Sequence, residues 1–567
     1  MEAEFSFSTE ARVAELEALL AKERARVSDL EKEKAVLRAS HERLRLELEL
    51  FRRRLFVAKA ERVNTKQLEL EFQSKLRALE EVAGTLGMAS GAPMSGPKVA
   101  AENSKRSSGR RDLRTLPLEE RRVEVTDPLF DELVAQGKAE RIGFEESCKL
   151  AWQRGGMRRI VIARVKYRTV GQDGESELAT APMPKELFWR AVFAVSLLAH
   201  IIIEKYCDGL PLFRIEDRFA RDGVSLDRGS MSRWVEDAGA TVGTTVIAAM
   251  RKEAMETAFC IATDATGVAV QPARAEENSP RQPCRRGHYF VQVVDKDAVF
   301  YEYAPRETSA AVADIFKGFK GHYIQADAKS VYDFLFRKPE DEPPDGDFRF
   351  EVACWSHCRR GFWEATAAKS VVAREGLARI SRIFELDATW KRQSPADIKR
   401  LRDAHLRPHV DAFFEWAALE FTKVKGQRGL VQKALGYACR HRDALCRFFD
   451  DGRLVLDNNR SELNLRKIAV GRKAWLFVGS DDHAVSAGNL FSLIATARLH
   501  RLEPEAYLRD LFRVLPFWPK DRYLELAPKY WPATRALLNP LELAAEVGDL
   551  AVPPPFVAAP VEQSSPG

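Results

Sequence analysis

The sequence predicts an α/β core with a long helical insertion, preceded by an N-terminal coiled coil and a small helical region. Three observations lead to this fold class. Apolar residues recur at heptad spacing near the N-terminus, two β-prone strands each carry a single aspartate, and residues 360–449 have helical composition. The chain has 567 residues, which suits several domains, since typical domains hold about 100–200 residues.

Composition excludes several classes of protein. The 89 Lys and Arg residues nearly balance the 83 Asp and Glu residues, so the surface as a whole is not a polyanion-binding coat. The eight cysteines are too sparse for a disulfide framework. The N-terminus lacks the pattern of a signal peptide, and the most apolar run, 191–203, is too short to span a bilayer. We therefore expect a soluble, cytoplasmic protein with no membrane partner.

Residues 11–83 predict a coiled coil. Ten of the thirteen a and d positions between Val13 and Leu55 are apolar, and neither Gly nor Pro occurs between Met1 and Ala83. Spacing of 3.5 residues keeps one stripe facing a partner helix, which predicts a homo-oligomer. The alternative is a single long amphipathic helix packed on its own domain.

Residues 84–124 change to Gly, Pro, Ser and basic residues and predict a flexible basic linker, which could also contact the DNA backbone. The range 181–255 then predicts three helices, over Leu187–Cys207, Pro211–Arg221 and Arg228–Glu236. This arrangement is similar to a helix-turn-helix, whose last helix would present Arg228, Ser230, Ser232 and Arg233 to a major groove. An ordinary helix pair in a core is the alternative.

The most informative region begins near residue 256. A strand carrying Asp264 is followed by a predicted hairpin (288–304), a helix (309–319), a strand ending at Asp327 and another strand (349–355). This order matches a ribonuclease-H-like core over 256–360 and 456–490, interrupted by a helical insertion over 361–455. In that topology the strands bearing Asp264 and Asp327 are neighbours.

A third acid follows the insertion. A helix that opens at Asp457 or Asn458 carries Glu462. Three converging carboxylates repel one another, and two Mg²⁺ ions about 4 Å apart would neutralise them, with Mn²⁺ as an alternative. Each acid also has a structural interpretation: Asp264 as a buried structural acid, Asp327 as a helix cap and Glu462 as a partner of Arg466.

Other residues near these acids are candidates for auxiliary roles. Cys354, His357 and Cys358 lack a fourth ligand, so zinc is not expected there. Asn458 and Glu462 share a helix face with Arg466, and further along Arg472 and Lys473 could hold phosphates of a DNA strand. The sequence also predicts a buried strand around Trp475 and Phe477.

The motifs resemble those of the transposases of the IS66 insertion-sequence family. They are ATDAT (262–266), QADAKSVYD (325–333), ACWSHCRRGF (353–362) and DGRLVLDNNRSELNLRKIAVGRKAWLFVGS (451–480). The resemblance implies that Asp264, Asp327 and Glu462 form a DDE triad, which binds the metals, with His357 and Asn458 as auxiliary residues. Residues 491–535 resemble the family's C-terminal helical element, and 551–567 predict a disordered tail.

The sequence departs from the family pattern at several positions. Ala265 replaces an acid, Gly267 replaces a Pro, and Asp482-His483-Ala484 replaces a pair of glycines. Residues 125–180 would be a zinc-ribbon-like region, but they carry only Cys148, so we expect a degenerate version without zinc.

The resemblance implies a transposase that cuts transposon ends and transfers them to target DNA. It also implies small accessory proteins from the same element. Two alternatives are a catalytically inactive, transposase-derived DNA-binding protein and a ribonuclease-H-like nuclease.

Overall fold

The computed structural model describes residues 118–153, 155–170, 176–188, 191–272, 283–327, 329–336, 349–368 and 370–555, together with Glu23, Arg26, Val27 and Leu116. The chain divides into two units, Met1–Gly109 and Arg110–Gly567. Nearly all of the predicted coiled coil (11–83) lies outside the described residues, as do most of the predicted linker and residues 556–567. The rest of this section concerns the second unit.

The first part of this unit is a small sheet with one helix. Its elements are β1 (Glu119–Val125), α3 (Pro128–Ala135), β2 (Ala139–Gln153), β3 (Gly156–Val170) and β4 (Ser176–Thr180). Strand β1 pairs in parallel with β3, which also pairs with β2 and β4. The predicted linker therefore extends too far, because its last residues form β1, whose Glu120 forms an ion pair with Arg159 at 2.7 Å. The predicted degenerate zinc-ribbon-like region (125–180) coincides with most of this sheet.

Four helices follow: α4 (Val195–Tyr206), α5 (Leu212–Arg221), α6 (Arg228–Val242) and α7 (Ala248–Thr257), the last two joined by a π-helical turn. The predicted start of the first helix at Leu187 is wrong, because the backbone around Phe193 instead bonds to Leu150 of β2. The predicted second and third helices are present, and Gly223 adopts a positive φ of 79° in the turn between them.

A five-stranded sheet forms the centre. It contains β5 (Cys260–Val270), β6 (Arg285–Val294), β7 (Ala298–Ala304), β8 (Tyr323–Ala326) and β9 (Phe350–Ala353) in the order β7-β6-β5-β8-β9, with α8 (Ser309–Ile315) between β7 and β8. The hairpin β6–β7 and the parallel pairing of β5 with β8 confirm the strand pairings predicted from the sequence.

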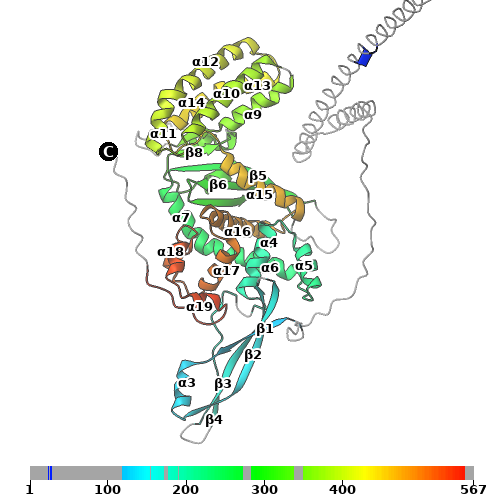
Figure 1. Ribbon diagram of the computed structural model, residues 1–567, viewed down its shortest axis with the longest axis vertical. Coiled ribbons are helices and arrows are strands. Elements are labelled where there is room, and N and C mark those ends of the chain that lie inside the picture. The colour runs from blue at the N-terminus through cyan, green and yellow to red at the C-terminus, as the bar shows by residue number, and fades with distance from the viewer. Residues whose placement is uncertain are drawn as a thin grey trace, which may run out of the picture. The chain divides into compact units, whose positions relative to one another are not determined.

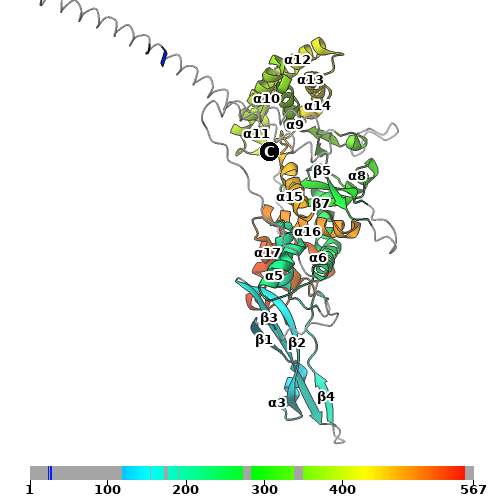
Figure 2. The same cartoon turned by 90° about the vertical axis from the view of Figure 1, so that its right-hand side faces the viewer.

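Helix α16 (Asp481–Leu499) holds the sheet to the helices α4–α7. Figures 1 and 2 both show it between the sheet and α6, and it contacts both β7 and α6. The Ser492 and Thr496 hydroxyls accept hydrogen bonds from Tyr301 N–H (2.9 Å) and Val299 N–H (3.1 Å) of β7. Since β7 is an edge strand, these hydroxyls satisfy backbone groups that would otherwise lack partners.

The insertion between β9 and the last core helix is helical, but its first helix begins at Trp355, before the predicted start of the insertion at 361. It comprises α9 (Trp355–Ala365), α10 (Val371–Thr389), α11 (Pro395–Leu401), α12 (Arg407–Val424), α13 (Leu430–Arg440) and α14 (Arg442–Cys446). These helices have an aromatic core of their own, in which Trp355 packs on Phe413 and Phe414 and donates its indole N–H to Leu445 O at 2.8 Å. They stand together above the sheet in Figure 1.

The chain then returns to the core through α15 (Asn459–Trp475), α16, α17 (Pro504–Val514), α18 (Trp531–Ala536) and α19 (Pro540–Ala544). The predicted buried strand around Trp475 is wrong, because α15 continues to Trp475 and the following Phe477 is exposed. Part of the predicted disordered tail is ordered, since Ala551 N–H donates to Glu542 at 2.9 Å. In the described part of the chain, no helix is long and apolar enough to cross a membrane.

The close approach of α6 to α16 gives a first prediction. A Cβ added at Gly239 of α6 would lie 2.3 Å from the Ser486 carbonyl oxygen of α16, so we expect Gly239→Ala to lower the free energy of unfolding by about 2 kcal/mol. Gly361 on α9 is the matched control, because its added Cβ would meet only ordinary contacts at 3.5 Å and alanine favours helix by about 1 kcal/mol. Thermal unfolding should separate the two variants; equal midpoints would contradict the packing described.

Candidate active site

Asp264 and Asp327 lie side by side where strands β5 and β8 pair. The last paired residues are Ala262 of β5 and Gln325 of β8, and each aspartate lies two residues further along its strand direction. Both side chains are mostly buried, at 14% and 13% exposed. The parallel register therefore produces the adjacency that the sequence predicts.

Lys329 supplies a positive charge between these carboxylates. Its Nζ atom is 3.8 Å from Asp264 Oδ1, 3.5 Å from Asp327 Oδ2 and 3.4 Å from Glu307 Oε1. Glu307 precedes α8, so residues from three separate segments meet here. One ammonium facing three carboxylates leaves the cluster with excess negative charge, which favours binding of a further cation.

Burial dominates the electrostatics of the two aspartates. Burial raises the pKa of Asp327 to about 6, against the opposing charge of Lys329 and with a smaller contribution from the charge of Asp264. Burial likewise raises the pKa of Asp264, and the charge of Glu462 adds to that rise while Lys329 lowers it. Asp327 Oδ1 is buried without a hydrogen-bond partner among the described residues. An unpartnered carboxylate oxygen of this kind is a suitable ligand for a hard cation.

Glu462 approaches from the first turn of α15. Its Oε1 atom lies 3.3 Å from Arg360 Nη2 and 3.7 Å from His357 Nε2, both on α9. Burial, followed by the positive charge of Arg360, lowers the pKa of His357, so the imidazole is neutral at neutral pH. The insertion therefore contributes two side chains that hold the glutamate near the aspartates.

Asn458 fixes where α15 begins. Its side-chain Nδ2 donates to Thr263 O, next to Asp264, at 2.8 Å, and its backbone N–H donates to Cys354 Sγ at 3.2 Å. The side chain is fully buried. Asn458 thus ties the start of the glutamate-bearing helix to the aspartate-bearing strand.

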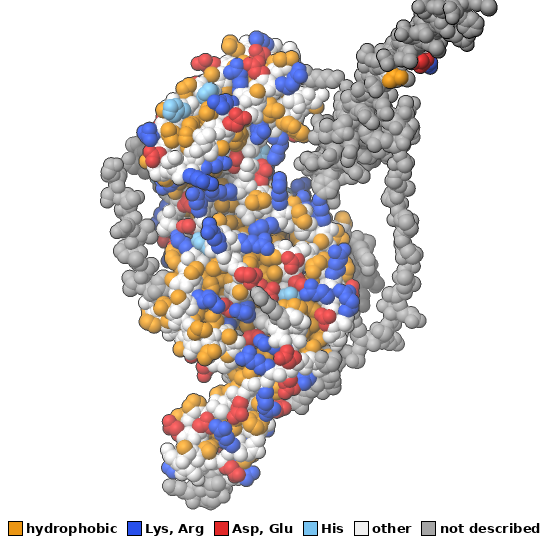
Figure 3. Space-filling view, in the orientation of Figure 1, with side chains coloured by type: hydrophobic (Ala, Val, Ile, Leu, Met, Phe, Trp, Pro, Cys, Tyr) orange, Lys and Arg blue, Asp and Glu red, His pale blue; other side chains and the backbone are white. Residues whose placement is uncertain are grey.

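The predicted DNA-contacting residues fall into two groups. Arg466 and Lys473 are exposed on α15, while Arg472 is half-buried and donates to Thr266 Oγ1 at 3.2 Å and to Gly267 O. Arg228 and Arg233 are exposed on α6, which packs on α16. Figure 3 shows Lys and Arg side chains gathered across this face at the level of the sheet and α15.

Comparison with known sequences settles the family. Residues 190–486 match the model of the "Transposase IS66 family", and residues 492–529 match the "IS66 C-terminal element". The chain belongs to the IS66 transposase family. Two residues that depart from the family pattern have close neighbours in the structure. At Gly267, an added Cβ would lie 2.5 Å from the Arg286 guanidinium. His483 Nε2 lies 2.8 Å from Glu236 Oε2.

Three relatives of this IS66 chain come from Sinorhizobium fredii. Uncharacterized protein y4qI is 27% identical over 531 residues, which is 90% of this chain and 93% of the relative. Uncharacterized protein y4hP is 24% identical over 66% of this chain and 69% of its own length. Uncharacterized protein y4jD is 26% identical over 63% of this chain and 70% of its own length. No solved structure matches the chain.

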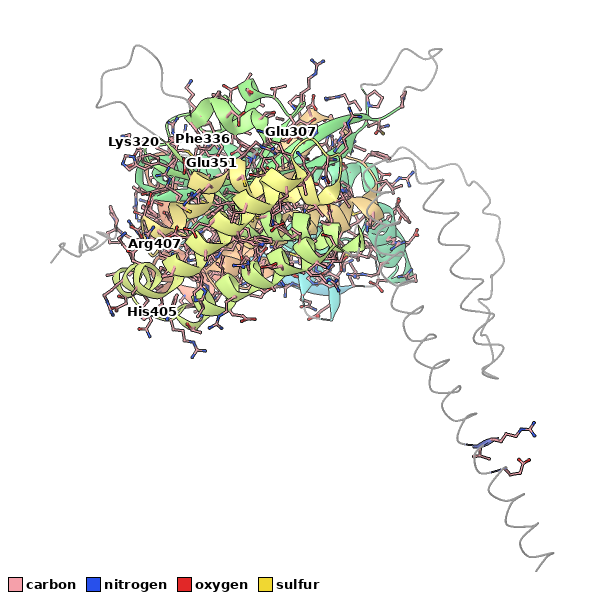
Figure 4. All side chains as sticks on the ribbon, turned by 90° about the horizontal axis from the view of Figure 1, so that it is seen from above. Glu307, Lys320, Phe336, Glu351, His405 and Arg407 are labelled. Atoms are coloured by element: carbon pink, nitrogen blue, oxygen red, sulfur yellow. The ribbon has the colours of Figure 1, made fainter. Side chains whose placement is uncertain are left out.

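Sequence reasoning missed three residues of this candidate site. Lys329 and Arg360 lie inside motifs that it singled out, but nothing in their spacing indicated a contact with Asp264 or Glu462. Glu307 belongs to no motif; Figure 4 shows it on the side of the strands, away from His405 and Arg407 of the helical insertion. Its approach to Lys329 depends on how α8 packs, which local sequence does not reveal.

The carboxylates of Asp264, Asp327 and Glu462 are suitable ligands for a divalent cation, but their present arrangement is not that of a formed metal site. No three His, Cys, Asp or Glu side chains in the described ranges are grouped tightly enough to hold a metal ion. The Lys329 ammonium lies among the carboxylates of Asp264, Asp327 and Glu307, where a metal ion would bind. The Glu462 carboxylate forms an ion pair with Arg360. Cys354 and Cys358 are buried thiols, and burial raises the pKa of both, that of Cys354 to about 11.

The raised pKa of Asp327 gives a second prediction. A carboxyl whose folded pKa lies near 6 contributes stability at low pH that is lost as the pH rises through that value. Asp327→Asn should therefore raise the unfolding midpoint of the metal-free protein at pH 7.5 by about 2–4 °C, with the difference shrinking towards pH 4.

The matched control is Asp333→Asn, an exposed acid in the turn that follows Asp327. Calorimetric scans of both variants at pH 4 and 7.5 test the prediction. A lower midpoint for Asp327→Asn at pH 7.5 would mean that the carboxylate stabilises the fold instead.

Proposed function

We propose that this chain is an insertion-sequence transposase that binds transposon ends and catalyses metal-dependent DNA cleavage and strand transfer. The observation that carries the proposal is the adjacency of Asp264 and Asp327 on β5 and β8, with Glu462 approaching from α15. Membership of the IS66 transposase family supports the same function.

The sheet supports a ribonuclease-H-like core. Its first three strands, β5, β6 and β7, are antiparallel neighbours, and β8 and β9 add in parallel on the other side of β5. This is the strand order expected when the first and fourth strands each carry a catalytic acid. The helical insertion between β9 and α15 then supplies His357 and Arg360 to the same site.

Asp264, Asp327 and Glu462 would hold two Mg²⁺ ions, with Mn²⁺ as an alternative. Bound metal ions supply Lewis-acid polarisation of the scissile phosphate and activation of the attacking oxygen. Lys329 neutralises the aspartates in the metal-free protein and has to withdraw when cations bind. Arg360 and the neutral His357 position Glu462.

The remaining basic residues divide between binding and positioning. Exposed Arg466 and Lys473 on α15 would bind phosphates of the strand that is cut, since they share the helix with Glu462. Arg472 positions α15 on β5 through Gly267 O and Thr266. Arg228 and Arg233 on α6 would bind the transposon end in a helix-turn-helix-like manner. The coiled coil would pair two protomers, and each would hold one end.

The third prediction concerns the carboxylates. Asp264→Asn should reduce Mg²⁺-dependent nicking of the element's end by about 100-fold or more, because a metal ligand is lost, while leaving end binding intact. Glu462→Gln should behave in the same way. The measurement is nicking and gel-shift binding on one labelled end duplex.

The control is Asp314→Asn, an exposed acid on α8. Full nicking by Asp264→Asn would refute the assignment of the active site. Binding without nicking by the wild-type protein would instead support a transposase-derived DNA-binding protein, and nicking without strand transfer would support a nuclease.

The fourth prediction concerns Lys329. Removing its ammonium eliminates a cation that competes with Mg²⁺, so Lys329→Met should bind Mg²⁺ about tenfold more tightly than the wild-type protein. Calorimetric titration without DNA measures this directly. Lys317→Met, which removes an exposed lysine of the α8 region, is the control. Weaker Mg²⁺ binding by Lys329→Met would show that the ammonium supports the metal site.

A further inference from the structure

A cavity lies between α6 and the end of α15, and neither Asp264, Asp327 nor Glu462 lines it. Its volume is about 520 Å³, within the range of about 300–1,000 Å³ typical of small-ligand sites. It is lined by residues of α4, α5, α6 and α16, by Trp475 at the end of α15 and by the segment that follows Trp475. Two of those helices, α6 and α15, carry the residues proposed above to contact DNA.

Aromatic rings form much of its lining. Tyr206 and Phe491 are buried and meet edge to face at 4.7 Å, while Phe213 and Phe477 are 45% and 43% exposed. Trp475, the last residue of α15, also lines the cavity. Exposed aromatic rings beside a cavity are costly in water and favour a flat, stacking ligand.

The backbone beside these rings is strained. Leu476, which ends α15, has a positive φ of 62° and is not glycine. Such a conformation is strained for a residue other than glycine and persists where the surrounding structure holds it. Here it accompanies the exposure of Leu476 and Phe477 next to the cavity, instead of the buried strand that the sequence predicts.

Polar groups complete the lining. Lys205 has no carboxylate partner among the described residues, and burial lowers its pKa to about 8. Arg228, at the first turn of α6, lines the same cavity. Glu236 Oε2 lies 2.8 Å from His483 Nε2, and His483 Nδ1 lies 2.9 Å from Ser480 Oγ. An ammonium without an acid partner is a binding group for an anion.

We propose that this cavity binds one nucleotide drawn out of the DNA stack, with its base among Phe213, Trp475 and Phe477 and its phosphate on Lys205 and Arg228. The proposal rests on the function proposed above. It adds that the protein recognises an unstacked base in the DNA. Base stacking on aromatic rings offsets the free energy needed to unstack a base. The Glu236 carboxylate would offer an acceptor to the edge of the base, since both ring nitrogens of His483 are already paired, with Glu236 and with Ser480.

The test compares three duplexes made from the DNA that flanks this gene. One is fully paired, one carries a single extra unpaired nucleotide near the cut position, and one carries an abasic residue in its place. The full chain should bind the bulged duplex about tenfold more tightly than the other two, measured by fluorescence anisotropy.

Variants assign that preference to the cavity. Phe213→Ala, Phe477→Ala and Lys205→Met should lose the tenfold preference and retain affinity for the paired duplex. Phe144→Ala, which removes an equally exposed ring (43%) from β2, and Lys296→Met, which removes an exposed lysine from the β6–β7 turn, should keep the preference.

The outcomes separate this proposal from the proposed function. If the wild-type protein nicks the paired end with Mg²⁺ but shows no preference for the bulge, or if the cavity variants keep that preference, only the nucleotide site is refuted. If the wild-type protein neither binds nor nicks any duplex, the transposase function itself fails. Binding of free deoxyadenosine monophosphate at micromolar concentration, without a preference for bulged DNA, would overturn a DNA nucleotide as the ligand.

Discussion

Two buried carboxylates that lie side by side require a positive charge, and the site described here is built around that requirement. The parallel pairing of β5 and β8 brings Asp264 and Asp327 together, and Lys329 lies within 3.8 Å of both. Glu307 adds a third negative charge to the same ammonium. Lys329 therefore stabilises the cluster when no metal is bound. One ammonium beside three carboxylates still leaves a net negative charge, which favours binding of a metal ion.

The rest of the unit keeps that pair of strands in place and brings the glutamate to it. Helix α16 satisfies the free edge of β7 with Ser492 and Thr496, which closes one side of the sheet. Asn458 ties the start of α15 to Thr263, one residue before Asp264. The insertion looks like an independent helical group, yet its first helix holds Glu462 through Arg360 and His357. Substitutions in the insertion can thus act on the active site.

Much of this arrangement could be predicted from local sequence. A short β-prone strand with one acid, 262–266, indicated a functional carboxylate. Two β-prone runs joined by residues 295–297 predicted the hairpin that the structure shows. What failed depended on distant contacts. The parallel pairing of β1 with β3, the contact of Phe193 with β2 and the approach of Glu307 to Lys329 are all tertiary events. Trp475 and Phe477 look like a buried strand because their composition is apolar, but the left-handed backbone at Leu476 leaves Phe477 exposed beside a cavity.

We propose that Asp264, Asp327 and Glu462 hold metal ions in one site, although they come from separate parts of the sequence. Replacing Mg²⁺ with Fe²⁺ and adding ascorbate and peroxide generates radicals at the metal, which cut the nearby backbone of the full chain. Mass spectrometry of the fragments should show cuts in three places, beside residues 264, 327 and 462, and excess Mg²⁺ should suppress all three together. Cuts confined to other segments, or cuts near Glu462 that persist when those near the aspartates are suppressed, would contradict a single shared site.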